Sequence, residues 1–362
     1  MLNSVKSKLI LKIITRKLTT KLKLRIFKYN KKVANRINID IQDYMNFYLL
    51  RELNQQLFKK IKDIDITELH LTSEDLNNEK LEYLNQIKFK HLKELNLSHN
   101  KISDIKLLEV LNYKNLEKLN LFSNEIKEIN SLENVYFTFL KELDLRQNYI
   151  TSIEVLSKVP FTNLEILRLS TNQISNINIL EKVNFKELKE LDLGENKISD
   201  INVLEKVDFE NLEKLNLSYN SIKNIDVLEK VNFKQLKELV LNHNEIQDIN
   251  ILDKTNFTHL ELLNLNDNQI SDIRIFKDVN FIELKKLCLC QNKMVNIDIF
   301  GKCNFPKLKY LYLLCNSISH VDISDEIRFD DVPKVYISKY SCNGLENIKN
   351  KVEIVYGNLW FN

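Results

Sequence analysis

The cysteines are the residues whose spacing comes nearest to a metal site, because four of the five lie between positions 288 and 315. Cys288 and Cys290 are two residues apart, so on a β-strand both thiols would face the same side, and Cys315 follows further along the chain. A thiolate zinc site takes four ligands, and no CxxC pair or neighbouring pair of histidines supplies the missing one. The sequence therefore predicts no metal site.

Catalytic motifs are the next feature to look for, and none of the familiar ones is present. Only six histidines occur, and none stands in a GxSxG or HExxH context that would indicate a hydrolase. The four glycines, Gly194, Gly301, Gly344 and Gly357, are too scattered to build a phosphate-binding loop. We therefore expect no catalytic residues, no cofactor and no enzyme activity.

The charge distribution is uneven although the net charge is only +3. Residues 1–39 contain twelve Lys and Arg and no Asp or Glu, which leaves the rest of the chain net acidic. A nucleic-acid-binding scaffold would need basic charge on its folded surface, so no nucleic-acid partner is expected. The basic segment has two interpretations, either a structural element or a signal for an organelle or an anionic membrane surface.

Cysteine usage and hydropathy together indicate a compartment. An odd number of clustered cysteines is no disulfide framework, so a reducing environment fits best. The sequence has no run of about 18 uncharged apolar residues, because Lys12 and Arg16 interrupt the apolar run after Lys8. Without a secretory signal peptide, the expected location is the cytoplasm, and organelle targeting by the N-terminus is the alternative.

A 24-residue period dominates the remaining sequence. Ten copies follow each other without a gap, beginning at Leu92, Leu116, Leu140, Leu164, Leu188, Leu212, Leu236, Leu260, Leu284 and Leu308. A 26-residue variant opens at Ile66, and a decayed copy opens at Val332. Such atypical end copies are expected of an array of stacked repeats.

A single copy shows what its first half does. In the copy that starts at Leu188, Leu191 and Leu193 have the two-residue period of a short strand, which directs Asp192 to solvent. Asn196 follows where the chain turns inward, and its amide can satisfy backbone groups there. The same Asn recurs at positions 100, 124, 148, 172, 196, 220, 244, 268, 292 and 316. We expect these side chains to form a stacked ladder.

The second half of each copy predicts the return path. The spacing of a helix capping box occurs in the pairs Asn178–Glu181, Asn202–Glu205 and Asp226–Glu229. Each copy is therefore expected to start a short helix there. An aromatic residue closes the copies at Tyr113, Phe137, Phe161, Phe185, Phe209, Phe233, Phe257, Phe281, Phe305 and Phe329. This recurrence predicts a buried aromatic spine rather than a cofactor site.

The recurring motif LxxLxLxxNxIxxIxxL resembles that of the leucine-rich-repeat family, and its NxIxxIxxL part is similar to the phosphatase-regulatory and internalin-like repeats. The resemblance implies an α/β fold, a solenoid shaped as a curved arc. Its parallel β-sheet would line the concave face, and short helices or turns would cover the convex face. It also implies a scaffold or regulatory subunit that binds a protein on the concave face.

Four segments follow from this pattern. Residues 1–39 are the basic segment, 40–65 a helical N-terminal cap, 66–331 the leucine-rich repeats, and 332–362 a degenerate last repeat with a C-terminal cap. Ordering one copy costs roughly 36 kcal/mol, while its apolar side chains contribute roughly 12 to 24 kcal/mol. Because one copy cannot fold alone, we expect an array without an internal domain boundary.

Apolar and aromatic residues collect at the C-terminal end of the predicted concave face. Strand alternation exposes there Tyr310, Tyr312, Leu314, Tyr336, Leu262, Cys288 and Cys290. Their composition is typical of a protein-binding hot spot. The alternative is that the tail from Ser341 to Asn362 folds over this region as a cap. A second group on the same face is Phe122, Arg146, Ile166 and Arg168, for which ordinary surface variation is the alternative.

Two other functions compete with a protein-binding scaffold. Residues 1–61 could dock the chain onto an assembly such as a ligase, which would make it a substrate-receptor adaptor. Residues 1–39 could instead direct it to a membrane surface or an organelle. An adaptor without residues 1–61 would lose its assembly and keep its substrate, and a fusion of residues 1–39 would reveal a targeting signal.

Overall fold

The computed structural model describes residues 67–72, 76–78, 89, 91–111, 113–319, 333–338 and 353–356. The chain divides into two compact units, one of Met1–Ile150 with Lys158–Leu164 and one of Thr151–Ser157 with Glu165–Asn362. The predicted basic segment and helical cap lie outside the described residues, as does the aromatic position at Phe329. An uninterrupted array over residues 66–331 stays a prediction.

The first unit is a small parallel sheet with short 3-10 helices. Its described elements are β1 (Glu68–His70), β2 (Glu94–Asn96), η3 (Lys106–Glu109), β3 (Lys118–Asn120), η4 (Asn130–Asn134) and β4 (Glu142–Asp144). Glu94 pairs with Lys118 and Lys118 with Glu142, which is the 24-residue period. Glu68 pairs with Glu94, so the step from β1 to β2 has the length of the longer variant copy that opens at Ile66.

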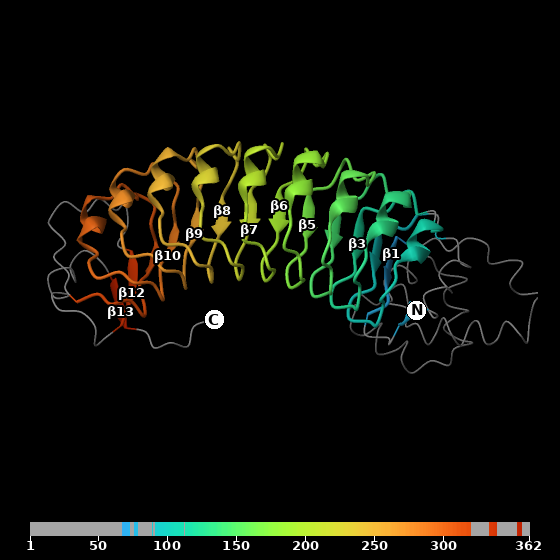
Figure 1. Cartoon of the computed structure of the whole chain (residues 1–362), viewed down its shortest axis with the longest axis horizontal. Coiled ribbons are helices and arrows are strands. Elements are labelled where there is room, and N and C mark those ends of the chain that lie inside the picture. Colours follow the sequence, from blue (N-terminus) through green and yellow to red (C-terminus); the bar gives the residue numbers. More distant parts are fainter. Residues whose placement is uncertain are drawn as a thin grey trace, which may run out of the picture. The chain divides into compact units, whose positions relative to one another are not determined.

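The second unit continues the same alternation of strand and 3-10 helix. Its described elements are η5 (Glu154–Ser157), β5 (Ile166–Arg168), η6 (Asn178–Lys182), β6 (Glu190–Asp192), η7 (Asn202–Glu205), β7 (Lys214–Asn216), η8 (Asp226–Glu229), β8 (Glu238–Val240), η9 (Asn250–Lys254), β9 (Leu262–Asn264), η10 (Arg274–Lys277), β10 (Lys286–Cys288), η11 (Asp298–Lys302), β11 (Tyr310–Tyr312), β12 (Lys334–Ile337) and β13 (Glu353–Tyr356). Neighbouring strands are parallel and follow chain order (Figure 1). Among these described elements, no helix is long and apolar enough to cross a membrane.

The core of both units consists of the predicted apolar positions. Leu191 and Leu193 are fully buried, while Asp192 between them is half-buried on the other face of β6. The aromatic positions from Phe137 to Phe305 are buried at every copy, so the predicted spine is confirmed for the described residues. A single face of the strands therefore remains for binding.

The predicted Asn ladder is confirmed, and Asn220 shows how it works. Its Nδ2 donates to the carbonyl oxygens of Leu193, Leu217 and Ser218 at 3.0, 3.1 and 3.1 Å. Its Oδ1 accepts the backbone N–H of Ile198 at 2.9 Å. One side chain thus bonds to four backbone groups of two neighbouring copies. It is the acceptor for the N–H of Ile198, and each of the three carbonyl oxygens accepts a second hydrogen bond from elsewhere.

The capping-box prediction is wrong. The N-cap position of η6 is Ile177, whose apolar side chain makes no capping hydrogen bond, and the element is a 3-10 helix. Asn176 takes over one position earlier, where its Oδ1 accepts the N–H of Asn178 at 2.8 Å. The Glu181 carboxylate pairs with Lys206 at 3.5 Å instead of returning to the cap. Asp200 and Asp248 make the same short turn in later copies.

Candidate functional site

Two rows of half-buried and exposed residues describe the strand face of the second unit. The lead row consists of the residues just before the strands: Glu165, Lys189, Glu213, Lys237, Glu261, Lys285 and Lys309. The first row consists of the first residue of each strand from β5 to β12: Ile166, Glu190, Lys214, Glu238, Leu262, Lys286, Tyr310 and Lys334. Strand pairing places neighbours in the first row side by side, so they interact laterally.

The three predicted tyrosines, Tyr310, Tyr312 and Tyr336, come together on β11 and β12 and form what we call the tyrosine cluster. The rings of Tyr312 and Tyr336 stack with centroids 4.4 Å apart and planes 10° apart. Tyr310 lies 6.4 Å from Tyr312 and is 39% exposed. The cluster is therefore an aromatic surface outside the core.

The residues predicted to surround these tyrosines are not all exposed. Cys288 is only 3% exposed and Leu314 only 9%, so their predicted exposure is wrong. Cys288 lies opposite Tyr312 in the strand pairing, where the large neighbouring ring shields the small thiol. Cys290 and Leu262 are half-buried.

Burial also sets the protonation of this region. It raises the pKa of Cys288 to about 12, that of Cys290 to about 11, and that of Tyr312 to about 12. The groups therefore stay neutral at physiological pH: the thiols are poor nucleophiles, and the phenol is a hydrogen-bond donor. Among the described residues, no group of His, Cys, Asp and Glu could hold a metal ion.

Two lysines beside the tyrosine cluster were missed by sequence reasoning. The Nζ atom of Lys286 lies 5.2 Å from the ring centroid of Tyr312, a cation–π contact. Its first-row neighbours are Leu262 and Tyr310, which carry no charge. Lys309 follows Lys285 in the lead row and directly precedes Tyr310. Neither Lys286 nor Lys309 has a carboxylate within ion-pair distance among the described residues.

Elsewhere in this unit, lysines of each row form ion pairs with glutamates of the same row. In the lead row, Lys189 pairs with Glu165 at 2.6 Å, Lys237 with Glu213 at 2.8 Å and Lys285 with Glu261 at 2.7 Å. In the first row, Lys214 pairs with Glu238 at 2.6 Å. The signal that could have revealed Lys286 and Lys309 is therefore the end of the alternation between Glu and Lys at successive copies.

A final strand, β13, was also missed. It pairs with β12 in parallel, with Lys334 opposite Glu353, a step that is shorter than the repeat and that no leucine motif marks. The Lys334 and Glu353 side chains form an ion pair at 3.3 Å. Tyr356 at its end is exposed. The rest of the tail proposed as a cover for the tyrosine cluster lies outside the described residues.

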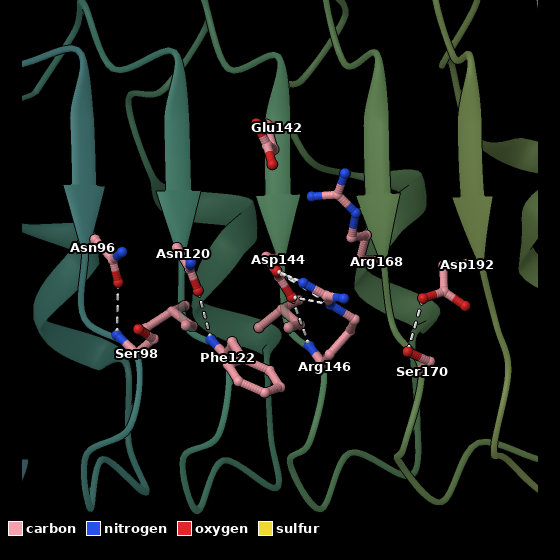
Figure 2. Close-up of polar contacts among 12 residues, drawn as sticks. Asn96, Ser98, Asn120, Phe122, Glu142, Asp144, Arg146, Arg168, Ser170 and Asp192 are labelled. Carbon is pink, nitrogen blue, oxygen red and sulfur yellow. Dashed lines mark hydrogen bonds and ion pairs between the residues drawn. The ribbon is translucent and has the colours of Figure 1, made fainter. Parts of the chain in front are cut away.

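The second predicted group is only partly brought together. In the first unit the guanidinium of Arg146 lies 5.3 Å from the ring centroid of Phe122 and forms a two-pronged ion pair with the buried Asp144 (Figure 2). Arg168 belongs to the second unit, where its Nε donates to Glu190 at 2.6 Å. Both Arg side chains are thus engaged with acidic side chains of their own unit.

A further polar group lies in the turns that follow the strands. The ring of Tyr219 stacks on His243 with centroids 4.3 Å apart, and His243 Nδ1 lies 2.5 Å from Asp267 Oδ2. These residues precede successive ladder Asn residues and have positive φ angles of 52°, 54° and 51°. An oriented His–Asp pair supplies two of the three members of a catalytic triad, but among the described residues no hydroxyl or thiol bonds to His243.

Protein-family models match leucine-rich repeats in this chain. The model for leucine-rich repeats in two copies matches residues 90–134, 138–182, 186–230 and 210–254, and a single-repeat model matches residues 258–273. No curated protein matches the chain.

Solved structures share the fold. An internalin, InlF of Listeria monocytogenes, is 22% identical with a TM-score of 0.61, covering 86% of this chain and 94% of its own. The functional domain of InlJ from the same organism, which includes a cysteine ladder, is 22% identical with a TM-score of 0.56, covering 73% and 52%. A TDR receptor is 19% identical with a TM-score of 0.57, covering 80% and 55%.

The repeat motif, the ladder of Asn residues, the parallel strands and the family models agree with one another. The chain belongs to the leucine-rich-repeat family.

Proposed function

We propose that this chain is a non-enzymatic scaffold that binds a protein partner on the exposed face of its parallel strands. Leucine-rich-repeat proteins commonly mediate protein–protein interaction. The observation that carries the proposal is the tyrosine cluster, which lies on the strand face and adds nothing to the leucine and phenylalanine core.

The composition of this surface supports binding rather than folding. Tyrosines are enriched at the centres of protein interfaces because each buries a large, rigid surface and keeps a hydroxyl for hydrogen bonding. Stacking of Tyr310, Tyr312 and Tyr336 holds the rings in place before a partner arrives. Less side-chain entropy is then lost on binding, which favours affinity.

Affinity purification followed by mass spectrometry tests the proposal with matched tyrosine variants. The full chain carrying Tyr310→Ala and Tyr312→Ala should lose specific partners that the unchanged chain retains. The control carries Tyr149→Ala and Tyr219→Ala, the same number of changes at two tyrosines that are each 48% exposed and lie after the strands, outside the cluster. Thermal unfolding of each variant verifies that it is folded.

The expected loss corresponds to hot-spot residues, at about 2 kcal/mol or more, which is roughly thirtyfold in Kd. Recovered partners that bind both double variants as tightly as the unchanged chain would place binding elsewhere and overturn the proposal.

A further inference from the structure

We propose that the partner segment seated on the tyrosine cluster is acidic and carries at least one large apolar side chain. This inference rests on the proposed function and adds the chemistry of the partner. The surface that recognises it is the tyrosine cluster together with Lys286 and Lys309, called below the basic–aromatic patch.

Charge distinguishes this patch from the rest of the strand face. Along the strand face of the second unit, the lysines of the two rows that precede Lys286 have carboxylate neighbours at less than 3 Å, as in the pairs Lys214–Glu238 and Lys237–Glu213. At β10 and β11 this neutralisation ends, because Leu262 and Tyr310 replace acidic residues on both sides of Lys286. The described part of the patch thus carries two unneutralised positive charges and no free carboxylate.

A partner that covers the patch must supply negative charge. A lysine that is removed from water without an anion is strongly destabilised, whereas a carboxylate brought to it restores the interaction. A neutral or basic partner covering the tyrosines would leave Lys286 unpaired beside Tyr312. An acidic partner pairs with both lysines while its apolar side chain covers the stacked rings.

The number of cations around the patch separates a peptide from other anions. Nucleic-acid binding relies on many phosphate contacts, and lipid surfaces are recognised by clusters of about four to eight Lys and Arg. Around the patch, Lys285 and Lys334 are already paired with Glu261 and Glu353, which leaves Lys286 and Lys309 as the two cations among the described residues there. Two cations beside a cluster of three tyrosines fit a few carboxylates and an apolar side chain better than a polyanion.

Selection from a phage-displayed random peptide library tests the inference on the full chain. Peptides enriched on the unchanged protein should contain Asp or Glu together with Phe, Tyr, Trp or Leu. A selected peptide, measured by fluorescence anisotropy, should bind the variant Lys286→Glu with Lys309→Glu at least about tenfold more weakly, because attraction becomes repulsion. The exposed Lys309→Glu change alone should weaken it in the same direction.

The matched control reverses the charge of two exposed lysines elsewhere in the same unit. Lys182→Glu with Lys302→Glu produces the same change in net charge at the ends of η6 and η11, away from the strand face. Binding of the selected peptide should stay within about twofold of the unchanged protein, since distant charges are screened at physiological salt.

Other outcomes separate the inference from the proposed function. Selected peptides without acidic residues, or equal weakening in the two charge variants, would overturn the inference. A loss caused by Tyr310→Ala and Tyr312→Ala but not by charge reversal would do the same and leave the proposed function standing. A library without enriched peptides, together with patch-dependent binding of oligothymidylate or phosphatidylserine vesicles, would replace the peptide with a polyanion.

Discussion

Two stretches of the second unit share one interior and differ at the surface. From β6 to β8, Lys214 pairs with Glu238 and Lys237 with Glu213. From β10 to β12, the corresponding surface contains the tyrosine cluster, Lys286 and Lys309. The comparison teaches that the repeat fixes the backbone and the core, whereas each strand contributes surface residues that can change independently of them.

Polar bonding shows the same contrast. In the first stretch, Asn216 Nδ2 donates to Asp192 Oδ1 at 2.7 Å, and Ser218 Oγ donates to Asn216 Oδ1 at 2.7 Å. Side chains there satisfy each other's hydrogen-bonding groups. In the second stretch the equivalent strand positions are Cys288 and Tyr312, which offer stacking and neutral groups instead. A closed polar network and an open aromatic surface are thus built on the same scaffold.

The largest expected effect tests whether the interiors are equivalent. Phe209→Ala and Phe305→Ala should each lower the free energy of unfolding by about 3 to 5 kcal/mol, because each removes a buried aromatic ring whose neighbours cannot collapse around the gap. Urea titration of the full chain measures both. A loss below about 1 kcal/mol at either position would mean that the interiors differ.

The next effect distinguishes a well-buried rung of the Asn ladder from one near the end. Asn220→Ala should cost about 2 to 4 kcal/mol, because the buried N–H of Ile198 loses its acceptor and three carbonyl oxygens each lose one of their two donors. Asn316 makes corresponding bonds but is half-buried, so water can replace some of them. Its change to Ala should cost about 1 to 2 kcal/mol.

Unfolding in urea provides the measurement for both Asn variants. Ser221→Ala, an exposed change next to Asn220, is the control and should cost less than about 0.5 kcal/mol. Equal losses at Asn220 and Asn316 would contradict the proposed dependence on burial.

The repeating parts of the fold could be predicted because one period keeps every position in the same environment. Leu191, Leu193, Asn196 and Phe209 were assigned correctly from a single copy, since stacking repeats the same contacts at each step. The 3-10 turns were harder. Whether Asn178 caps a helix depends on backbone angles at Ile177, which residue types alone do not determine.

The candidate site was predicted less completely because its burial and its ion pairs depend on residues of the neighbouring strands. Sequence alternation placed Tyr312 outside the core, but the burial of Cys288 depends on the size of the ring on the neighbouring strand. The unpaired state of Lys286 likewise depends on the residues that face it from the copy before and the copy after. Strand β13 was missed because its step from β12 is shorter than the repeat and no leucine motif marks it.

A pH effect should be specific to the second stretch. The pKa of Cys288 is raised by burial from 9.0 to about 12, so the folded state holds the thiol proton more tightly than the unfolded state. That contribution to stability is fully present below pH 9 and is lost as the pH rises toward 12. At pH 10 the loss from this thiol should be about 1 to 2 kcal/mol.

Urea titration at pH 7 and pH 10 in the presence of a reductant isolates the thiol when the unchanged chain is compared with Cys288→Asn. The variant carries Asn, which occupies the same strand position in two other copies, as Asn216 and Asn264. It should lose less stability on going to pH 10. Identical losses in the two proteins would show that Cys288 does not carry the effect.

The smallest expected effect concerns the lead row itself. Lys237 pairs with Glu213 at 2.8 Å, and both side chains are partly exposed, so removing the pair with Lys237→Gln should cost about 0.5 kcal/mol at low salt. Lys309 has no carboxylate neighbour in the described residues and follows Lys285 in the row. Lys309→Gln should therefore leave the free energy of unfolding unchanged or raise it slightly, because repulsion between like charges is relieved. Urea titrations at low and high salt should bring the two variants together as screening increases. A loss at Lys309 as large as that at Lys237 would mean that Lys309 already has an anionic neighbour, and the contrast between the paired and unpaired stretches would fail.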